Sequence, residues 1–289
     1  MKSQKSFQTT TGILYIVPTP IGNLEDMTFR AIKVLQEADL IAAEDTRNTR
    51  KLLTHFQIST SMISYHEHNK QVSGKNIIDH LLNNKIIALV SDAGMPGISD
   101  PGYELVEEAI NNNIPVISLP GANAALTALT ASGIVPQPFS FYGFLPRKKK
   151  EREKELEFLK NKPETIIFYE APHRLKETIT SIYDSFGNRK IVLARELTKK
   201  HEEYIRGDLK EIVTWLEEAE IRGEFCLIVE GCKENIADSE ALWWHTLTIN
   251  EHVEYYIEKG LSSKEAIKQT AHDRNIGKRE VYQSYHVKE

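Results

Sequence analysis

The chain has 289 residues, of which 40% are hydrophobic and 27% charged, as in ordinary folded proteins, and its formal net charge is −5. This charge excludes a uniformly basic surface, so that any contact with nucleic acid must be local. Two cysteines, Cys226 and Cys232, are too few for a disulfide framework, and no apolar run approaches the ~20 residues of a membrane-spanning helix.

Residues 1–11 are polar and lack the apolar core of a signal peptide, so we expect a mobile tail there and, with so few cysteines, a cytoplasmic protein. Residues 12–119 then alternate between continuous apolar runs and patterns with helical spacing. The apolar runs predict strands buried on both faces, at residues 13–17, 40–43, 62–65, 86–90 and 114–119. This alternation predicts an N-terminal α/β domain with a parallel sheet.

Residues 120–236 predict a second α/β domain. It opens with a helix of small residues, "ANAALTALTAS", and the adjacent strand-like pieces of "ARELTKKHEEYIRG" indicate a hairpin, so this sheet is expected to be mixed. Residues 237–289 contain no further strand pattern and predict a helical extension. Its last two helices are joined at "RNIGK", and Ser262 or Ser263 is the expected N-cap.

Polar or glycine-rich loops follow all five strands of the first domain: "PTPIGN", "EDTRNTR", "HEHN", "SDAGMPGISDPG" and "PGAN". In open parallel sheets, ligands bind outside the carboxyl ends of the strands, so these loops predict a binding site. The common phosphate-binding glycine motifs are missing. The loop at residues 91–102 would let backbone approach a ligand closely, although two successive turns would also explain its glycines.

Six motifs occur in order between Gly12 and Gly231: "VPTPIGNLEDMTFRAIKVLQEADLIAAEDTRNTRKLL", "SDAGMPGISDPG", "LPGANAALTALTASG", "FYGFLPRK", "FYEAPHR" and "GEFCLIVEG". Together they resemble the tetrapyrrole methylase superfamily, and within it the ribosomal RNA small subunit methyltransferase I branch. The resemblance implies two α/β domains with S-adenosylmethionine in the cleft between them, and a homodimer. It also implies 2′-O-methylation of a cytidine in the decoding region of the 16S rRNA of the 30S subunit.

The resemblance also implies which residues line the cofactor. Glu170 stands where many members of the superfamily carry methionine, and Cys226 stands where many carry alanine. Carried over position by position, the cofactor-binding residues are Pro20, Asp92, Ala93, Gly94, Ile98, Ser99, Asn123, Ala124, Glu170 and Cys226.

A ribose hydroxyl needs its proton removed or hydrogen-bonded as it attacks a methyl group. Asp45 is our first choice for this role, with Glu44 beside it. Asp45 could instead cap the helix that follows it, which is a common role for aspartate at such a boundary. Further candidates at neighbouring strand ends are His66, His68, Asp100, Glu170 and His173.

Arginine suits RNA phosphate because its guanidinium is a planar fork of donors, and Arg47, Arg50, Arg147 and Arg174 are the predicted RNA contacts. Each could instead form a surface ion pair. The C-terminal helices resemble a short helix-turn-helix, which could bind RNA or support a dimer. No cysteine or third histidine lies near His66 and His68 in the sequence, so no metal site is expected.

Two other classes of function stay open. One is a methyltransferase of the same fold that acts on a tetrapyrrole or another small molecule. The other is a non-catalytic ribosome-assembly factor that keeps the cofactor pocket. The loops "EDTRNTR" and "FYEAPHR" match the rRNA branch and speak against the small-molecule enzyme, and the near-complete set of loops speaks against a decayed site.

Overall fold

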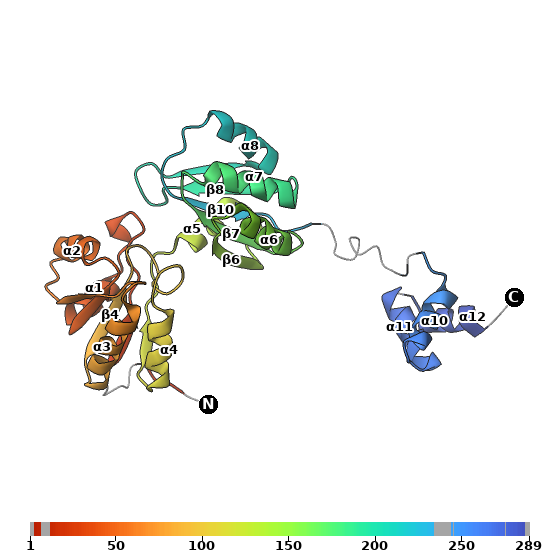
Figure 1. Cartoon of the computed structure of the whole chain (residues 1–289), viewed down its shortest axis with the longest axis horizontal. Coiled ribbons are helices and arrows are strands. Elements are labelled where there is room, and N and C mark those ends of the chain that lie inside the picture. The colour runs from red at the N-terminus through yellow and green to blue at the C-terminus, as the bar shows by residue number, and fades with distance from the viewer. Residues whose placement is uncertain (1–2, 7–11, 234–243, 245, 275, 287–289) are drawn as a thin grey trace. The chain divides into compact units, whose positions relative to one another are not determined.

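The computed structural model describes residues 3–6, 12–233, 244, 246–274 and 276–286 (Figure 1). The chain divides into two compact units, Met1–Gly231 and Cys232–Glu289. The predicted boundary between residues 236 and 237 lies outside the described residues, as does most of the predicted tail. The division of the first unit at residues 119 and 120 stays a prediction.

The first sheet of unit 1 is parallel throughout, with strand order β3-β2-β4-β1-β5, which confirms the predicted parallel sheet. Its strands are short and mostly buried, because helices cover both faces. The side-chain amide of Gln4 pairs with the backbone N–H and C=O of Val116, at the edge of the sheet. The strands are β1 (Ile13–Ile16), β2 (Leu40–Ala43), β3 (Met62–Ser64), β4 (Ile86–Val90) and β5 (Val116–Ser118).

The four helices of this region pack in pairs on opposite faces of the sheet. One apolar core joins α1 and α2 to the sheet, and a second core on the other face joins α3 and α4 to it. The carboxyl ends of all five strands therefore meet at one edge, between the two helical layers. The elements are η1 (Leu24–Asp26), α1 (Phe29–Glu37), α2 (Thr46–His55), α3 (Lys70–Leu82) and α4 (Tyr103–Asn111).

The second sheet of unit 1 has strand order β6-β7-β10-β8-β9. Only β6 and β7 pair in parallel; β10 is antiparallel to β7 and β8, and β8 and β9 form the predicted antiparallel hairpin. The prediction of a mixed sheet is confirmed. The strands are β6 (Phe139–Phe144), β7 (Thr165–Glu170), β8 (Lys190–Arg195), β9 (Glu203–Asp208) and β10 (Phe225–Val229).

Helix α5 covers one face of this sheet, and α6, α7 and α8 cover the other. Ala125 and Ala128 of α5 are buried against the strands, as its run of small residues predicts. The helices are α5 (Ala124–Ser132), α6 (Lys149–Leu159), α7 (Leu175–Phe186) and α8 (Leu209–Glu218).

Unit 2 contains three helices in its described part: α10 (Ile249–Glu258), α11 (Ser263–Asp273) and α12 (Lys278–His286). They enclose a small core that includes Val253 and Val281. Ser262 is the N-cap of α11, in a reciprocal capping box with Glu265. None of the described helices is long and apolar enough to cross a membrane.

Candidate active site

The loops after β1 and β4 are joined by backbone hydrogen bonds. Thr19 and Gly94 exchange two N–H···O=C bonds, each 2.9 Å long. The buried Thr19 hydroxyl also donates to the carbonyl oxygen of Ser91, at 3.1 Å. This bridge fixes the start of the glycine-rich loop against the neighbouring loop of the sheet.

Three glycines give the loop at residues 91–102 its shape. Gly94 and Gly97 have φ near +78°, a backbone region that side chains disfavour. A Cβ on Gly94 would lie 3.3 Å from the Ile21 side chain, and a Cβ on Gly102 would lie 3.0 Å from the Gly97 Cα atom. The tight approach of residues 97 and 102 closes the loop on itself and places residues 98–100 at its tip.

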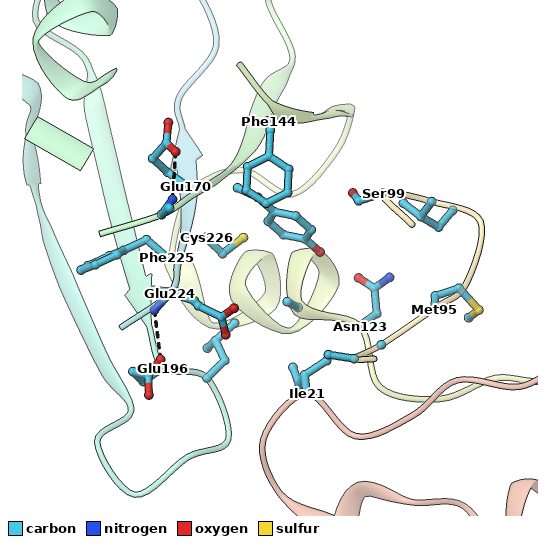
Figure 2. Close-up of a pocket in the computed structure, with 18 of the residues that line it drawn as sticks. Ile21, Met95, Ser99, Asn123, Phe144, Glu170, Glu196, Glu224, Phe225 and Cys226 are labelled. Carbon is cyan, nitrogen blue, oxygen red and sulfur yellow. Dashed lines mark hydrogen bonds between the residues drawn. The ribbon is translucent and has the colours of Figure 1, made fainter. Parts of the chain in front are cut away.

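A cavity of about 290 Å³, which we call the main cavity, lies between these loops and the ends of β7, β8 and β10. Figure 2 shows the side chains of Met95, Ser99 and Asn123 on one side of it and those of Glu224 and Cys226 on the other. Asn123 is also the N-cap of α5, where its side-chain oxygen accepts from the N–H of Leu126 at 2.9 Å. The predicted cofactor residues that line this cavity are Ala93, Gly94, Ile98, Ser99, Asn123, Ala124, Glu170 and Cys226.

The other two predicted cofactor residues, Pro20 and Asp92, line a separate cavity of about 250 Å³. Asn48 and Lys51 of α2 contribute to the same cavity. The structure therefore brings most of the predicted cofactor residues together and places these two in the neighbouring cavity.

Asp92 connects the loops after β2 and β4. Its carboxylate accepts from the backbone N–H of Asp45 at 3.2 Å and from the side-chain amide of Asn48 at 3.0 Å. Its own N–H donates to the Glu44 carboxylate at 3.2 Å. These contacts give Asp92 and Glu44 a part in holding the two loops together.

Asp45 is the N-cap of α2, where its carboxylate accepts from the N–H of Arg47 at 2.8 Å. The Arg47 guanidinium also reaches both carboxylate oxygens, at 3.1 and 2.7 Å. These hydrogen bonds from Arg47 lower the pKa of Asp45 to about 2. A carboxylate with so low a pKa is a weak base at neutral pH.

Asp100, at the tip of the glycine-rich loop, has the opposite environment. It lines the main cavity and is partly buried. Burial, with repulsion from Glu44 and Asp92, outweighs a hydrogen bond from Ser91 and raises the pKa of Asp100 to about 6.

Glu170 and Cys226 form the wall on the β7 and β10 side. The Glu170 carboxylate is buried, and it accepts from the Thr178 hydroxyl at 2.6 Å and from the N–H of Ala171 at 2.8 Å. Burial raises the pKa of the Cys226 thiol to about 12, so this thiol is neutral and contributes shape rather than charge.

The predicted RNA-contacting arginines have different surroundings. Arg47 is largely exposed and pairs with Asp45, while Arg50 and Arg147 are exposed. Arg174 is 14% exposed at its side chain and donates to the carbonyl oxygens of Leu145 and Pro146, at 2.9 and 3.3 Å.

The sequence of this chain matches known proteins over its whole length. A model of the family described as Tetrapyrrole (Corrin/Porphyrin) Methylases matches residues 13–213. The ribosomal RNA small subunit methyltransferase I of Bacillus subtilis (strain 168) is 61% identical over 291 residues, covering 100% of both chains. The protein of the same name from Halalkalibacterium halodurans is 58% identical and covers 99% of each chain.

The chain belongs to the ribosomal RNA small subunit methyltransferase I branch of the tetrapyrrole methylase family. Membership in this branch confirms the predicted family and enzyme class. Solved structures of the tetrapyrrole methylase fold agree at low identity. The methyltransferase CobJ has a TM-score of 0.58 at 16% identity, covering 77% of this chain and 95% of its own. Uroporphyrin-III C-methyltransferase from Thermus thermophilus, complexed with S-adenosylhomocysteine, has a TM-score of 0.55 at 17% identity, covering 76% and 97%.

The main cavity of this methyltransferase fits the S-adenosylmethionine that its family uses. Its lining combines apolar side chains, among them Ile21, Leu197 and Phe225, with carboxylates and exposed backbone. A Cβ on Gly94 would narrow the cavity near Ile21, so the glycine leaves room there for a ligand. Apolar walls with a few polar groups suit a ligand that carries adenine, hydroxyls and an ammonium group.

Sequence reasoning missed a charged cluster in this methyltransferase. Lys199, in the β8–β9 connection, forms ion pairs with Glu196 at 3.0 Å and with Glu224 at 2.9 Å, and all three line the main cavity. The signal available in the sequence was their place next to the ends of β8 and β10. Among the described residues, no group of three or more His, Cys, Asp or Glu side chains is arranged to hold a metal ion.

Proposed function

We propose that this protein transfers the methyl group of S-adenosylmethionine to the ribose 2′-hydroxyl of a cytidine in the decoding region of 16S rRNA. The observation that carries the proposal is the 61% identity, over the full length of both chains, with a protein named ribosomal RNA small subunit methyltransferase I. The match includes the C-terminal helical segment, which lies beyond residues 13–213 of the family model.

The cofactor would lie in the main cavity, against the backbone of residues 93–94 and the side chains of Asn123 and Ala124. When bound, S-adenosylmethionine supplies a methyl group on a positively charged sulfur. The protein's part is to hold donor and acceptor in line and to keep water out, and positioning of this kind supplies much of the reduction in the barrier. The rigid frame for this is the bridge between Thr19 and Gly94.

RNA would contact local basic groups, since the chain as a whole is acidic. Arg147 begins an exposed basic run that continues to Lys150. The backbone just before and at Arg147 is held by Arg174 and by the buried Arg152, which donates to the Arg147 carbonyl oxygen at 3.2 Å. We therefore propose Arg147 and Arg50 as phosphate contacts, and Arg174 as a residue that positions the loop.

The homodimer, the assembled 30S subunit as substrate and a cytoplasmic location are parts of the same proposal. They are supported by the family to which the chain belongs and, for the location, by the ribosomal substrate. Light scattering on the purified protein tests the dimer, for which we expect about twice the 33.0 kDa of one chain.

The test of the reaction is transfer of tritium from labelled S-adenosylmethionine to 30S subunits of a strain that lacks this protein. Naked 16S rRNA and a corrin-ring precursor are offered in parallel. Label on 30S subunits alone supports the proposal. Label on the corrin precursor alone would support a small-molecule methyltransferase, and binding of S-adenosylmethionine without transfer to any of the three would support a non-catalytic assembly factor.

A further inference from the structure

Four carboxylates line the main cavity, in the part of the chain that the structure describes: Asp100, Glu170, Glu196 and Glu224. A group that accepts a proton from a substrate hydroxyl must reach the cavity and must have an oxygen that is not already committed to a protein donor. The environments of the four carboxylates differ sharply in this respect.

The Glu170 carboxylate, at the end of β7, is turned toward α7, because one oxygen accepts from the Thr178 hydroxyl and the other from the N–H of Ala171. Its side chain is fully buried, and the Arg174 guanidinium lies 3.6 Å away. Glu170 is thus part of the wall that supports β7 and the loop after it.

Glu196 and Glu224 share the ammonium group of Lys199. Glu196 also accepts from the N–H of Glu224 at 2.9 Å (Figure 2). Burial would raise the pKa of Glu196, but these hydrogen bonds and the Lys199 charge outweigh it and leave the pKa below its usual value. Both carboxylates are therefore committed to the Lys199 ammonium group.

Asp100 differs from the other three. No salt bridge to it is found among the described residues, and the charged groups that act on it most strongly are the carboxylates of Glu44 and Asp92. Ser91, at the end of β4, supplies its hydrogen bond. The close approach of Gly97 and Gly102 fixes the loop tip that carries Asp100, so its position is set by backbone geometry.

We propose that Asp100 is the general base of the methyl transfer, and this rests on the proposed function. The ribose oxygen forms a new O–CH₃ bond while the S–CH₃ bond of the donor breaks, and the electron pair of that bond stays on sulfur. The proton of the 2′-hydroxyl passes to the Asp100 carboxylate and then to water. The donor leaves as S-adenosylhomocysteine, whose thioether sulfur is neutral, and the positive charge of the sulfonium is balanced by the released proton.

The same geometry explains why Asp45 is less suited to this role. Both of its oxygens accept from the Arg47 guanidinium, and it lies outside the lining of the main cavity. Asp100 lines the cavity, and its pKa of about 6 leaves it ionised but basic at neutral pH. A base whose pKa lies near the working pH is the more effective one.

The test compares Asp100→Asn with the wild-type enzyme, and Asp79→Asn serves as a control. Asp79 is an exposed carboxylate on α3 that does not line the main cavity, and its change to asparagine is chemically the same. We expect kcat on 30S subunits to fall about 10²- to 10⁴-fold in Asp100→Asn, the usual contribution of a general base. The affinity for S-adenosylhomocysteine, measured by calorimetry, should stay within about threefold of wild type, because an asparagine keeps the shape of the site.

Two measurements on the wild-type enzyme complement the variant. The rate should fall tenfold per pH unit below about pH 6, and carboxyl-carbon NMR should show Asp100 titrating over the same range. The proposal is overturned if Asp100→Asn keeps the wild-type kcat, or if the pH profile has no acid limb. An equal loss of S-adenosylhomocysteine affinity and of kcat/KM, with kcat unchanged, would make Asp100 a cofactor contact instead. Absence of transfer by the wild-type enzyme would refute the proposed function itself, and the role of Asp100 would fall with it.

Discussion

Removal of the Asp100 charge is expected to stabilise the fold at neutral pH. Its pKa is raised from 3.8 to about 6 by burial and by the carboxylates of Glu44 and Asp92. The pKa of Asp100 is higher in the folded state than in the unfolded state, so the folded protein favours the protonated form. The stability that this preference provides is fully present below about pH 4 and is lost as the pH rises through about 6. At about 1.36 kcal/mol per pKa unit, up to about 3 kcal/mol of the free energy of unfolding is lost by pH 7.5.

An asparagine at this position is uncharged at every pH, so Asp100→Asn should escape the loss. The difference in the free energy of unfolding between the variant and the wild type should therefore shift in favour of the variant by up to about 3 kcal/mol as the pH rises from 4 to 7.5. The assay is urea unfolding at both pH values. Unfolding is monitored by pulsed hydrogen exchange of peptides from β4, so that the signal reports on the sheet that carries the loop. Asp79→Asn should show no such gain. A difference between Asp100→Asn and wild type that is the same at both pH values would refute the electrostatic reasoning.

Three further predictions concern residues that shape the site and the C-terminal unit. Gly94→Ala should weaken S-adenosylhomocysteine binding in calorimetry and destabilise unit 1 by about 1 kcal/mol or more, because Gly94 has a φ of +78° and a Cβ there would lie 3.3 Å from Ile21. An unchanged affinity would contradict the proposal that Gly94 helps to form the cofactor site. Thr178→Val should cost about 1–3 kcal/mol in urea unfolding by removing the donor to the buried Glu170 carboxylate, and an unchanged midpoint would count against that network. Burial lowers the pKa of His252 below 6.5, so unit 2 should lose stability as the pH falls below that value. Hydrogen exchange of α10, corrected for intrinsic rates, should therefore show less protection at pH 5 than at pH 7.5. Equal protection at the two pH values would contradict this prediction.

The central strands of the first sheet can be predicted from the sequence because they are buried on both faces and therefore consist of apolar residues. Runs such as residues 40–43 and 86–90 are apolar without interruption, as strands buried on both faces require. The carboxyl ends of parallel strands meet at one edge, so the loops after them lie close together whatever the lengths of the helices between them. That rule predicts most of the cavity lining before any side-chain position is known.

Backbone pairing decides what the sequence could not predict. Pro20 and Asp92 lie next to the bridge between Thr19 and Gly94, and which cavity a side chain enters beside such a bridge depends on its local φ and ψ. Arg174 shows a similar limit, because an arginine at the start of α7 looks like a surface charge in the sequence. Its 14% exposure follows from a loop that folds over it.

The cluster of Lys199 with Glu196 and Glu224 shows a limit of a different kind. Glu224 is separated from Lys199 by 25 positions in the sequence, and only the pairing of β8 with β9 and β10 brings the two together. The positive φ of Glu196, at 49°, is likewise set by the turn after β8 rather than by its residue type. Ion pairs of this kind become visible only after the register of the strands is known.

Methyl transfer to one ribose oxygen of 16S rRNA is the reaction that we propose for this protein. Its most direct test is to label 30S subunits from a strain lacking this protein, digest the purified 16S rRNA with alkali, and look for the label. Alkali cleaves RNA through the free 2′-hydroxyl, so a 2′-O-methyl group protects the linkage beside it. Label in a single alkali-resistant dinucleotide that begins with cytidine is the result we predict. Label recovered only in mononucleotides would place the methyl group on a base and contradict the account.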